Sequence, residues 1–257
     1  MFNHAMAGTD RLRQITDAVR SAGRAGVAEL AALTGASEMT IRRDLEVLAE
    51  QGILERYRGG ARSLLLRGEE PPFALRTQEG LDAKRRIAAE VAGLIADGES
   101  VVLDSGTTCL EVARVLEHRR LTVVPLSLHA VNALAGAAQL TLLVPGGRPR
   151  QGELALTGPL TQASLAALRF DTAVIGCCGL TAADGLTAYD LDDAAVKRAA
   201  IASSRRVIAV AEAAKLTRTA LAFVTAASAL DAVVTDETAT DEETDRLAAA
   251  GVTVRKV

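Results

Sequence analysis

The sequence predicts an α/β protein in two parts: an N-terminal winged helix-turn-helix and a doubly wound, mainly parallel α/β domain. Three helical patterns followed by a hairpin pattern predict the first part. From residue 81 onward, short apolar runs alternate with helical segments, as in a parallel sheet covered by helices. Hydrophobic residues make up 49% of the 257, which is enough for a sizeable core. We therefore predict the winged helix-turn-helix at 1–66, a linker at 67–80 and the α/β domain at 81–257.

The first part begins with a helical pattern in "TDRLRQITDAVRSAG", where Thr9 is the expected N-cap and Gly23 the expected stop. A second short helix is predicted in "VAELAALTGAS", with Leu30 and Leu33 facing inward. Ser37 then caps a third helix, and "ILERYRGGA" has the β-character and the closing glycine pair of a hairpin. A tight turn between the second and third helices, followed by a hairpin, is typical of a winged helix-turn-helix.

The second part alternates helices with short β-like runs. Helix "AKRRIAAEVAGLIADG" leads to strand "SVVLD", and further strands are predicted in "LTVVP", "LTLLVP", "FDTAVIG", "RVIAVA", "DAVVTD" and "VTVRKV". The stretch 121–147 contains no Asp, Glu, Lys or Arg, but its apolar pieces are short, so a buried strand–helix–strand explains it better than a membrane span. Because the chain also starts without a secretory pattern, we expect a soluble, cytoplasmic protein with no membrane partner.

Composition narrows the classes of function. Aromatic residues are 2% of the chain and Trp is absent, which excludes a stacking platform for single-stranded nucleic acid. The three cysteines predict neither a disulfide framework nor a metal site, and we expect Cys177 and Cys178 to be packing residues and the protein to need no cofactor. Residues 1–68 hold 10 Lys and Arg against 8 Asp and Glu, and the remaining residues hold 19 against 24. This asymmetry favours a modest anion-binding module at the N-terminus.

Two adjacent arginines, Arg42 and Arg43, lie in the predicted third helix, "SEMTIRRDLEVL". At 100° per residue the apolar positions share one side, while Met39 and Arg43 point nearly opposite and Thr40 and Arg42 flank them. The outward face is therefore cationic and polar near the helix N-terminus. A recognition helix that enters the major groove with its first turns needs this arrangement, because its early side chains meet base edges.

Ion pairs offer a plainer explanation of these arginines. Glu38–Arg42 and Arg42–Glu46 are both i,i+4 pairs, which would stabilise a solvated helix face by a few tenths of a kcal/mol each. The hairpin decides in favour of DNA, because its three arginines lie close together and are costly to hold there without an anion. The predicted DNA-binding residues are Ser37, Glu38, Met39, Thr40, Arg42, Arg43, Arg56, Arg58 and Arg62.

This part of the chain resembles the DNA-binding domain of DeoR-type bacterial transcriptional regulators. The resemblance rests on Thr-Ile-Arg-Arg-Asp-Leu at 40–45 and on Gly-Gly-Ala at 59–61, with Arg58 where the family usually has His. It implies that the partner is double-stranded operator DNA. Arg58 would then add a contact to phosphate.

In the second part, "LDSGTTCLEVARVL" places a glycine and three hydroxyl side chains between a strand and a helix. The N–H groups of the loop and of the first helical turn, with the hydroxyls of Ser105, Thr107 and Thr108, would form a phosphate cradle. Such loops also simply cap helices. The loop is neither a P-loop nor a dinucleotide fingerprint, because it lacks both Gly-Lys-Ser/Thr and G-x-G-x-x-G.

Ligands of doubly wound sheets bind at the carboxyl ends of the strands, where this chain offers several polar residues. Lys215 would elsewhere be an ordinary surface lysine, but after a buried strand it is a candidate partner for a phosphate or carboxylate. Asp104 and Asp236 either bind ligand hydroxyls or cap strand ends, and ligand binding is favoured for Asp104.

The resemblance continues to the end of the chain, across the effector domain of DeoR-type regulators, which is similar in fold to sugar-phosphate isomerases and CoA-transferases. It covers Asp-Ser-Gly-Thr-Thr, two glycine-containing segments, a lysine after a strand end and a closing Thr-Asp. Two departures border the expected pocket: Pro125-Leu126 replaces Thr-Asn, and Glu212 replaces Asp. The effector-binding residues predicted in this way are Asp104, Ser105, Gly106, Thr107, Thr108, Gly146, Gly147, Gly179, Asp184, Lys215 and Asp236.

The residues and the resemblance together predict a DNA-binding transcriptional regulator of a carbohydrate catabolic operon. We expect it to be a repressor. A phosphorylated sugar or related effector would release it from operator DNA, and two-fold operators imply a homo-oligomer, either a dimer or a tetramer. The alternative is a sugar-phosphate isomerase-like enzyme with an accessory N-terminal domain. Isomerisation needs a carboxylate base, and none directly follows the strand that ends "VIGCCGL", so we expect no enzyme. A scaffold without DNA affinity is the third possibility.

Overall fold

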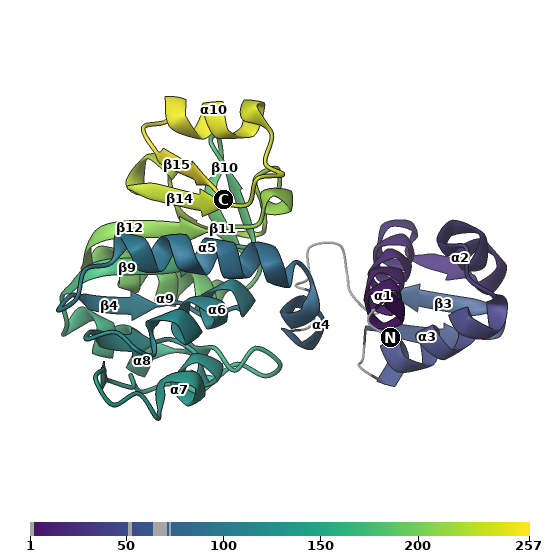
Figure 1. Cartoon of the computed structure of the whole chain (residues 1–257), viewed down its shortest axis with the longest axis horizontal. Helices are drawn as coiled ribbons and strands as arrows, with labels where there is room; N and C mark the ends of the chain where they lie inside the picture. The colour runs from purple at the N-terminus through teal and green to yellow at the C-terminus, as the bar shows by residue number, and fades with distance from the viewer. Residues whose placement is uncertain (1–2, 51–52, 64–70, 72) are drawn as a thin grey trace. The chain divides into compact units, whose positions relative to one another are not determined.

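The computed structural model describes residues 3–50, 53–63, 71 and 73–257, and the chain forms two compact units, Met1–Glu79 and Gly80–Val257 (Figure 1). The predicted linker contains a short helix at its carboxyl end, α4 (Phe73–Gln78). Arg76 stabilises its start, because Nε donates to the Pro71 carbonyl at 2.8 Å and the guanidinium lies 5.8 Å from the centre of the Phe73 ring. The rest of the predicted linker, except 71 and 79–80, lies outside the described residues.

The first unit has the predicted winged helix-turn-helix order. Its helices are α1 (Asn3–Ala22), α2 (Val27–Thr34) and α3 (Glu38–Glu50), and its strands are β1 (Arg24–Gly26), β2 (Leu54–Tyr57) and β3 (Gly60–Ser63). The strands form one antiparallel sheet in the order β1-β3-β2. The short strand β1 has no counterpart in the sequence prediction, since three residues show no periodicity and the strand exists only through its pairing with β3.

Local signals in this unit are confirmed in part. The Ser37 hydroxyl accepts a hydrogen bond from the Thr40 N–H at 3.2 Å, which confirms the predicted cap of α3. Gly35 closes α2 with a φ of +67°, as the tight turn requires. Two predictions are wrong: α1 begins at Asn3, so Thr9 lies inside it, and Leu33 is 58% exposed. The residues of α2 that are buried in the core are Val27 and Leu30, both in its first turn, and the core does not extend to Leu33 in the second turn.

The second unit is built on a seven-stranded sheet in the order β15-β14-β12-β9-β4-β5-β6, in which every pair is parallel. From β4 the chain adds strands outward on one side, and from β9 it adds them on the other, so the strand order reverses between β4 and β9. Ligands of doubly wound sheets bind at such a reversal. The strands are β4 (Ser100–Leu103), β5 (Thr122–Pro125), β6 (Thr141–Leu142), β9 (Phe170–Gly176), β12 (Ser204–Val210), β14 (Ala232–Thr235) and β15 (Thr253–Lys256).

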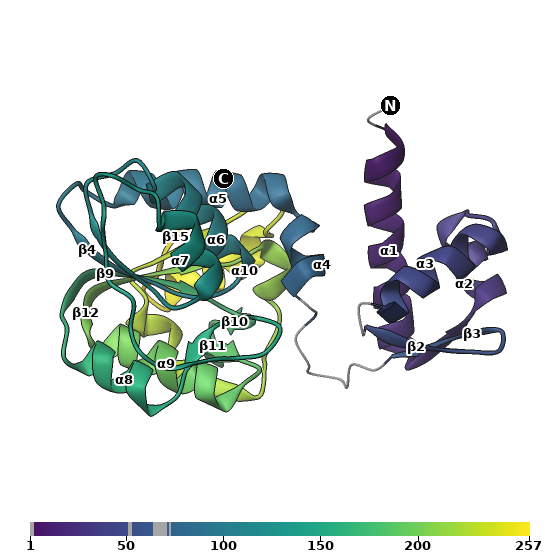
Figure 2. The same cartoon turned by 90° about the horizontal axis from the view of Figure 1, so that it is seen from below.

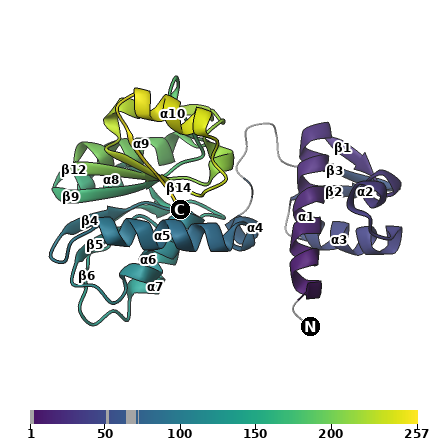
Figure 3. The ribbon, with the colours of Figure 1, turned by 45° about the horizontal axis from the view of Figure 1, so that its top comes forward.

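Helices cover both faces of this sheet, which confirms the doubly wound prediction. Figures 2 and 3 show α5 (Leu81–Leu94), α6 (Thr107–Leu116) and α7 (Leu128–Leu134) on one face. The opposite face carries α8 (Pro159–Ala166), α9 (Leu191–Ala202) and α10 (Asp241–Ala249), together with a small antiparallel sheet. That sheet consists of β10 (Gly179–Thr181), β11 (Gly185–Ala188) and β13 (Ala222–Thr225), and a separate hairpin pairs β7 (Arg148–Pro149) with β8 (Leu156–Thr157).

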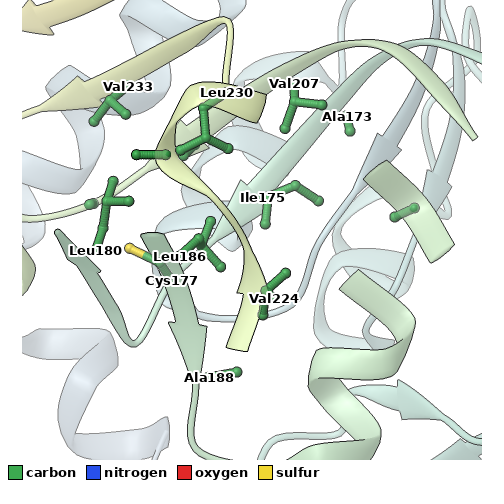
Figure 4. Packing of buried hydrophobic residues seen from close by; sticks show 14 of the residues in the cluster. Ala173, Ile175, Cys177, Leu180, Leu186, Ala188, Val207, Val224, Leu230 and Val233 are labelled. Carbon is green, nitrogen blue, oxygen red and sulfur yellow. The ribbon is translucent and has the colours of Figure 1, made fainter. Parts of the chain in front are cut away.

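The core follows the alternation of side chains along buried parallel strands. In β4, Val101 and Leu103 pack under α5 and α6, while Val102 points to the other face. Figure 4 shows that second face, where Ala173 and Ile175 of the central strand pack toward residues of the small sheet. Both sheet faces are apolar, as expected for parallel strands covered on each side.

No helix in the described part of the chain is long and apolar enough to cross a membrane.

Candidate functional site

The exposed face of α3 carries the predicted arginine pair. Arg42 donates to Glu38 at 2.7 Å, so the first of the two i,i+4 pairs forms. Arg43 is exposed and has no ion pair among the residues that the structure describes, and Met39 beside it is 60% exposed. The cation on this helix that remains available to an external anion is therefore Arg43. The charge pattern expected of a recognition helix is present at its N-terminal turns.

The hairpin carries less uncompensated positive charge than its three arginines suggest. Arg56 pairs with Glu46 at 3.0 Å, and Arg62 pairs with Glu55, so neighbouring carboxylates neutralise two of the three. The prediction that the hairpin arginines are costly to hold together without an anion is therefore wrong for Arg56 and Arg62. Arg58, at the hairpin tip, is exposed and has no ion pair in the described residues. The register also places Arg24 of β1 opposite Arg62, which adds a cation that the sequence did not associate with the hairpin.

A partly buried ion pair fixes α3 against α1. Asp44 accepts hydrogen bonds from Arg11 Nε at 2.6 Å and from Arg11 Nη2 at 3.2 Å. The hydrogen bond to Asp44 raises the pKa of Arg11. Asp44 lies about 200° around the helix from Arg42 and about 100° from Arg43, so it can face α1 while the arginines face outward. The aspartate of the Thr-Ile-Arg-Arg-Asp-Leu segment therefore positions the helix that presents Arg43.

In the second unit, Asp104 lies at the point where the strand order reverses. It follows β4, and its Oδ2 accepts from the Gly176 N–H at 2.9 Å at the end of the neighbouring strand β9. The approach is close, because a Cβ on Gly176 would lie 3.0 Å from the Ser105 carbonyl and 3.4 Å from Cys109 Sγ. Asp104 is 1% exposed, so it positions the loop rather than offering a free carboxylate to solvent.

The partner of Asp104 is a lysine that the sequence prediction missed. Lys197 of α9 is 3% exposed and contacts Asp104 Oδ2 and, at 3.4 Å, Asp193 Oδ2. Burial alone would lower the pKa of Lys197, but the two carboxylates outweigh it and raise that pKa well above its usual value. The available signal was Asp193 and Lys197 at i,i+4 in "DLDDAAVKRAA", yet only the fold brings this pair to Asp104.

The Ser-Gly-Thr-Thr loop leads directly into the N-terminus of α6. Gly106 is the N-cap of α6 with a φ of +98°. The first N–H groups of a helix have no intrahelical partner, and here the N-cap residue has no side chain that could accept from them. Thr107 and Thr108 form the first turn. Thr108 is 4% exposed, and its Oγ1 has no hydrogen-bond partner in the described part of the chain. A buried hydroxyl without a partner at a helix N-terminus is what a ligand oxygen would satisfy.

A second cluster of charges lies after β12. Lys215 ends a short 3₁₀ helix, Ala213–Lys215, and its Nζ is 3.9 Å from Glu212 Oε1. The same Glu212 oxygen is 3.7 Å from Nζ of Lys84, a lysine of α5 that is 1% exposed. Lys84 is the second basic residue that the sequence prediction missed, because no local pattern distinguishes it from the arginines that follow it.

Cys177 and Cys109 are buried thiols that lie near charges of both clusters. Burial raises the pKa of Cys177, which also experiences the charges of Lys215, Lys197, Asp104 and Glu212. Burial likewise raises the pKa of Cys109. Both thiols therefore stay protonated, and Cys177 packs in the core as predicted rather than acting as a nucleophile.

Asp236 caps the end of β14. Its Oδ2 accepts from the Ala213 N–H at 2.7 Å and its Oδ1 from the Thr238 hydroxyl and N–H. Burial alone would raise the pKa of Asp236, but these hydrogen bonds outweigh it and lower the pKa. Of the two readings left open for Asp236, the geometry favours the cap, while the adjacent Thr235 has a buried hydroxyl without a partner in the described residues.

The remaining predicted residues are spread over other loops. Gly147 has a φ of +135°, and a Cβ there would collide with Thr161 of α8. Gly179 packs closely on the Arg218 carbonyl within the small antiparallel sheet. Asp184 lies between β10 and β11, where it accepts from Thr219 at 2.7 Å. Each of these contacts explains the residue locally, and none joins it to Asp104 or Lys215. A cleft of about 760 Å³ between α6 and α7 includes none of the predicted residues in its lining.

Comparison with known proteins agrees with this architecture. Residues 11–65 match the DeoR-like helix-turn-helix domain, and residues 79–237 match the DeoR C terminal sensor domain. The chain belongs to the DeoR family. The glycerol-3-phosphate regulon repressor of Escherichia coli K12 is 32% identical over 90% of this chain and 92% of its own. The HTH-type transcriptional regulator GlpR of Haloferax volcanii is 30% identical over 97% and 98%.

As a member of the DeoR family, the protein is a DNA-binding transcriptional regulator, with a sensor domain in the second unit. Ribose 5-phosphate isomerase from Methanocaldococcus jannaschii superposes with a TM-score of 0.41 over 53% of this chain and 55% of that one, at 15% identity, which is too weak a likeness to support a conclusion. The isomerase alternative is not favoured, because the relatives that match over most of the chain are named transcriptional regulators or repressors.

Proposed function

We propose that this DeoR-family protein is a repressor that binds operator DNA through α3 and the β2–β3 hairpin and leaves it when a phosphorylated sugar or related metabolite occupies the sensor domain. The relative in Escherichia coli K12 is named for a glycerol-3-phosphate regulon, which supports a small phosphorylated effector. The protein works in the cytoplasm. It acts as a homo-oligomer, because a two-fold operator needs two recognition helices.

One observation carries the ligand half of this proposal: the buried Thr108 hydroxyl has no partner in the described residues and lies in the first turn of α6. A buried polar group without a hydrogen bond costs about 1–3 kcal/mol, and a phosphate oxygen would recover it. The N-terminal N–H groups of α6 favour the same anion.

The charges suggest how the effector is oriented. Asp104, Lys197 and Asp193 together carry a net charge of −1, whereas Lys84, Glu212 and Lys215 carry +1. We expect the phosphate to bind between the α6 N-terminus and Lys215, and ligand hydroxyls to lie toward the Asp104 side. Thr235, whose buried hydroxyl also lacks a partner in the described residues, is a further candidate for a ligand hydroxyl.

The test uses the full-length protein and a labelled duplex from the region upstream of its own gene. Fluorescence anisotropy should give salt-dependent binding, and glycerol 3-phosphate, ribose 5-phosphate and fructose 6-phosphate are then added in turn. We expect at least one to weaken operator binding about tenfold or more. Absence of binding to the duplex in dilute buffer would contradict the DNA half. Binding that none of the three compounds weakens would contradict the effector half.

A further inference from the structure

Glu212 contacts two lysines from different elements. Its Oε1 lies 3.9 Å from Nζ of Lys215, in the candidate effector site, and 3.7 Å from Nζ of Lys84, in the first turn of α5. Lys84 is almost fully buried, and a buried ammonium needs a nearby opposite charge to remain in the interior. Glu212 is one such charge, and its contact with Lys84 links the start of α5 to the carboxyl end of β12.

Glu212 also lies against the backbone where the second unit begins. Gly80 precedes α5 with a φ of +56°, and a Cβ at this position would collide with Glu212 Oε2. The Lys84 N–H donates to the Gly80 carbonyl at 3.0 Å, so the first helical turn depends on the same residue. Gly80 is the first residue of the second unit, and the chain before it leads to the DNA-binding domain.

An anion in the effector site changes the balance of these contacts. At nearly 4 Å, the Lys215–Glu212 pair is loose, and a phosphate dianion would compete with Glu212 for the Lys215 ammonium. When that pairing weakens, the carboxylate keeps Lys84, beside Gly80, as its other ion-pair partner among the described residues. A change at the site thereby reaches the first turn of α5, because the same carboxylate lies beside Lys84 and against Gly80.

We propose that Glu212 is the coupling residue of the sensor domain: through Lys84 and Gly80 it transmits occupation of the effector site to the start of α5, where the DNA-binding unit is attached. This inference rests on the proposed function and adds the route by which it is regulated. Lys84 and Gly80 act by positioning the helix and do not contact the effector.

The first experiment needs no ligand and follows amide hydrogen exchange of residues 80–86 in the full-length protein. Glu212→Gln removes the carboxylate charge beside Lys84, so the Lys84 amide should exchange about tenfold faster or more. Glu90→Gln is the matched control, because this substitution removes another ion pair of α5, the contact between Glu90 and Arg255 at 2.7 Å. Unchanged exchange in Glu212→Gln, or the same acceleration in Glu90→Gln, overturns the proposed contact.

The second experiment measures coupling with the three sugar phosphates named above. At a concentration of the active compound that saturates the variant, the operator affinity of Lys84→Met should change less than about twofold. Gly80→Ala, which presses on the same carboxylate, is a second variant with the same expected loss, and Glu90→Gln should respond as wild type. A full response in both variants overturns the relay alone. A wild type that binds none of the compounds overturns the proposed function and the relay with it.

Discussion

At the scale of single residues, Thr108 separates a structural role from a binding role. Most buried hydroxyls in a folded protein have a partner, and those that do not mark strain or a missing ligand. Asp104 and Lys197, by contrast, are buried and satisfied by each other, so removing either one would damage the fold as well as the site. Substituting Thr108 therefore tests ligand binding with less risk to stability.

We predict that Thr108→Val lowers affinity for the effector at least about tenfold and leaves thermal stability unchanged or slightly higher, because valine has the same shape without the unpaired hydroxyl. Isothermal titration and differential scanning calorimetry measure the two effects. Thr187→Val is the control: its hydroxyl donates to the Gly179 carbonyl at 3.1 Å and accepts from the Ala220 N–H at 2.9 Å, so this variant should lose stability and keep the ligand. A less stable Thr108→Val with normal binding would contradict the ligand role.

Asp236 gives a prediction about pH. Its pKa is lowered in the folded state, so its carboxylate stabilises the fold above the unfolded pKa of about 3.9, and this contribution is lost as the pH falls through the folded pKa. Asp236→Asn should therefore be less stable than wild type at pH 7, and the difference should shrink below about pH 4. Urea unfolding at pH 7, 5 and 3 measures the difference in unfolding free energy between the two proteins. A difference that does not change with pH would show that the charge of Asp236 is irrelevant to stability.

At the scale of elements, α3 combines a fixed inner side with a free outer one. Asp44 holds the helix to α1 through Arg11, and the apolar positions of α3 are buried in the core of the first unit. On the outer side, Arg42 is paired and Arg43 is not, within the described residues. The difference matters for recognition, because a guanidinium without an ion pair can approach a base edge without first breaking one.

Arg43→Ala should weaken binding to operator DNA by about 1–3 kcal/mol and change binding to random duplex much less, because a base contact carries sequence information. Arg205→Ala removes one exposed arginine from the sensor domain and should leave both affinities unchanged. Anisotropy titrations on the two duplexes measure the effect. An equal loss on both would assign Arg43 to a phosphate.

At the scale of the whole molecule, the two compact units communicate only if ligand and DNA binding are thermodynamically linked. If the effector weakens operator binding by some factor, operator DNA must weaken effector binding by the same factor. We predict that titrating effector into the protein–operator complex and into free protein gives a ratio of dissociation constants equal to the ratio of operator constants measured with and without effector. Unequal ratios would indicate a further state, such as a change in oligomer.

Several parts of this architecture were predictable from residues that act locally. The Ser37 cap, the extent of β9 and the alternation of apolar runs all depend on neighbours in sequence, and each is present in the structure. The Thr-Ile-Arg-Arg-Asp-Leu segment indicated the family in the same way. The predicted start of α1 and the predicted inward side of Leu33 were wrong, because helix length and burial depend on what packs nearby.

By itself, then, the sequence determined the fold class, the helix-turn-helix pattern and the glycine-containing loop before α6, since caps, periodicity and glycine positions act over a few residues. Only the tertiary structure decided which charges meet. It paired Lys197 with Asp104 across 93 residues, brought Lys84 to Glu212, and turned Asp236 into a cap. Ion pairs form between groups that are close in space, and for residues on separate strands and helices that closeness is set by the sheet order.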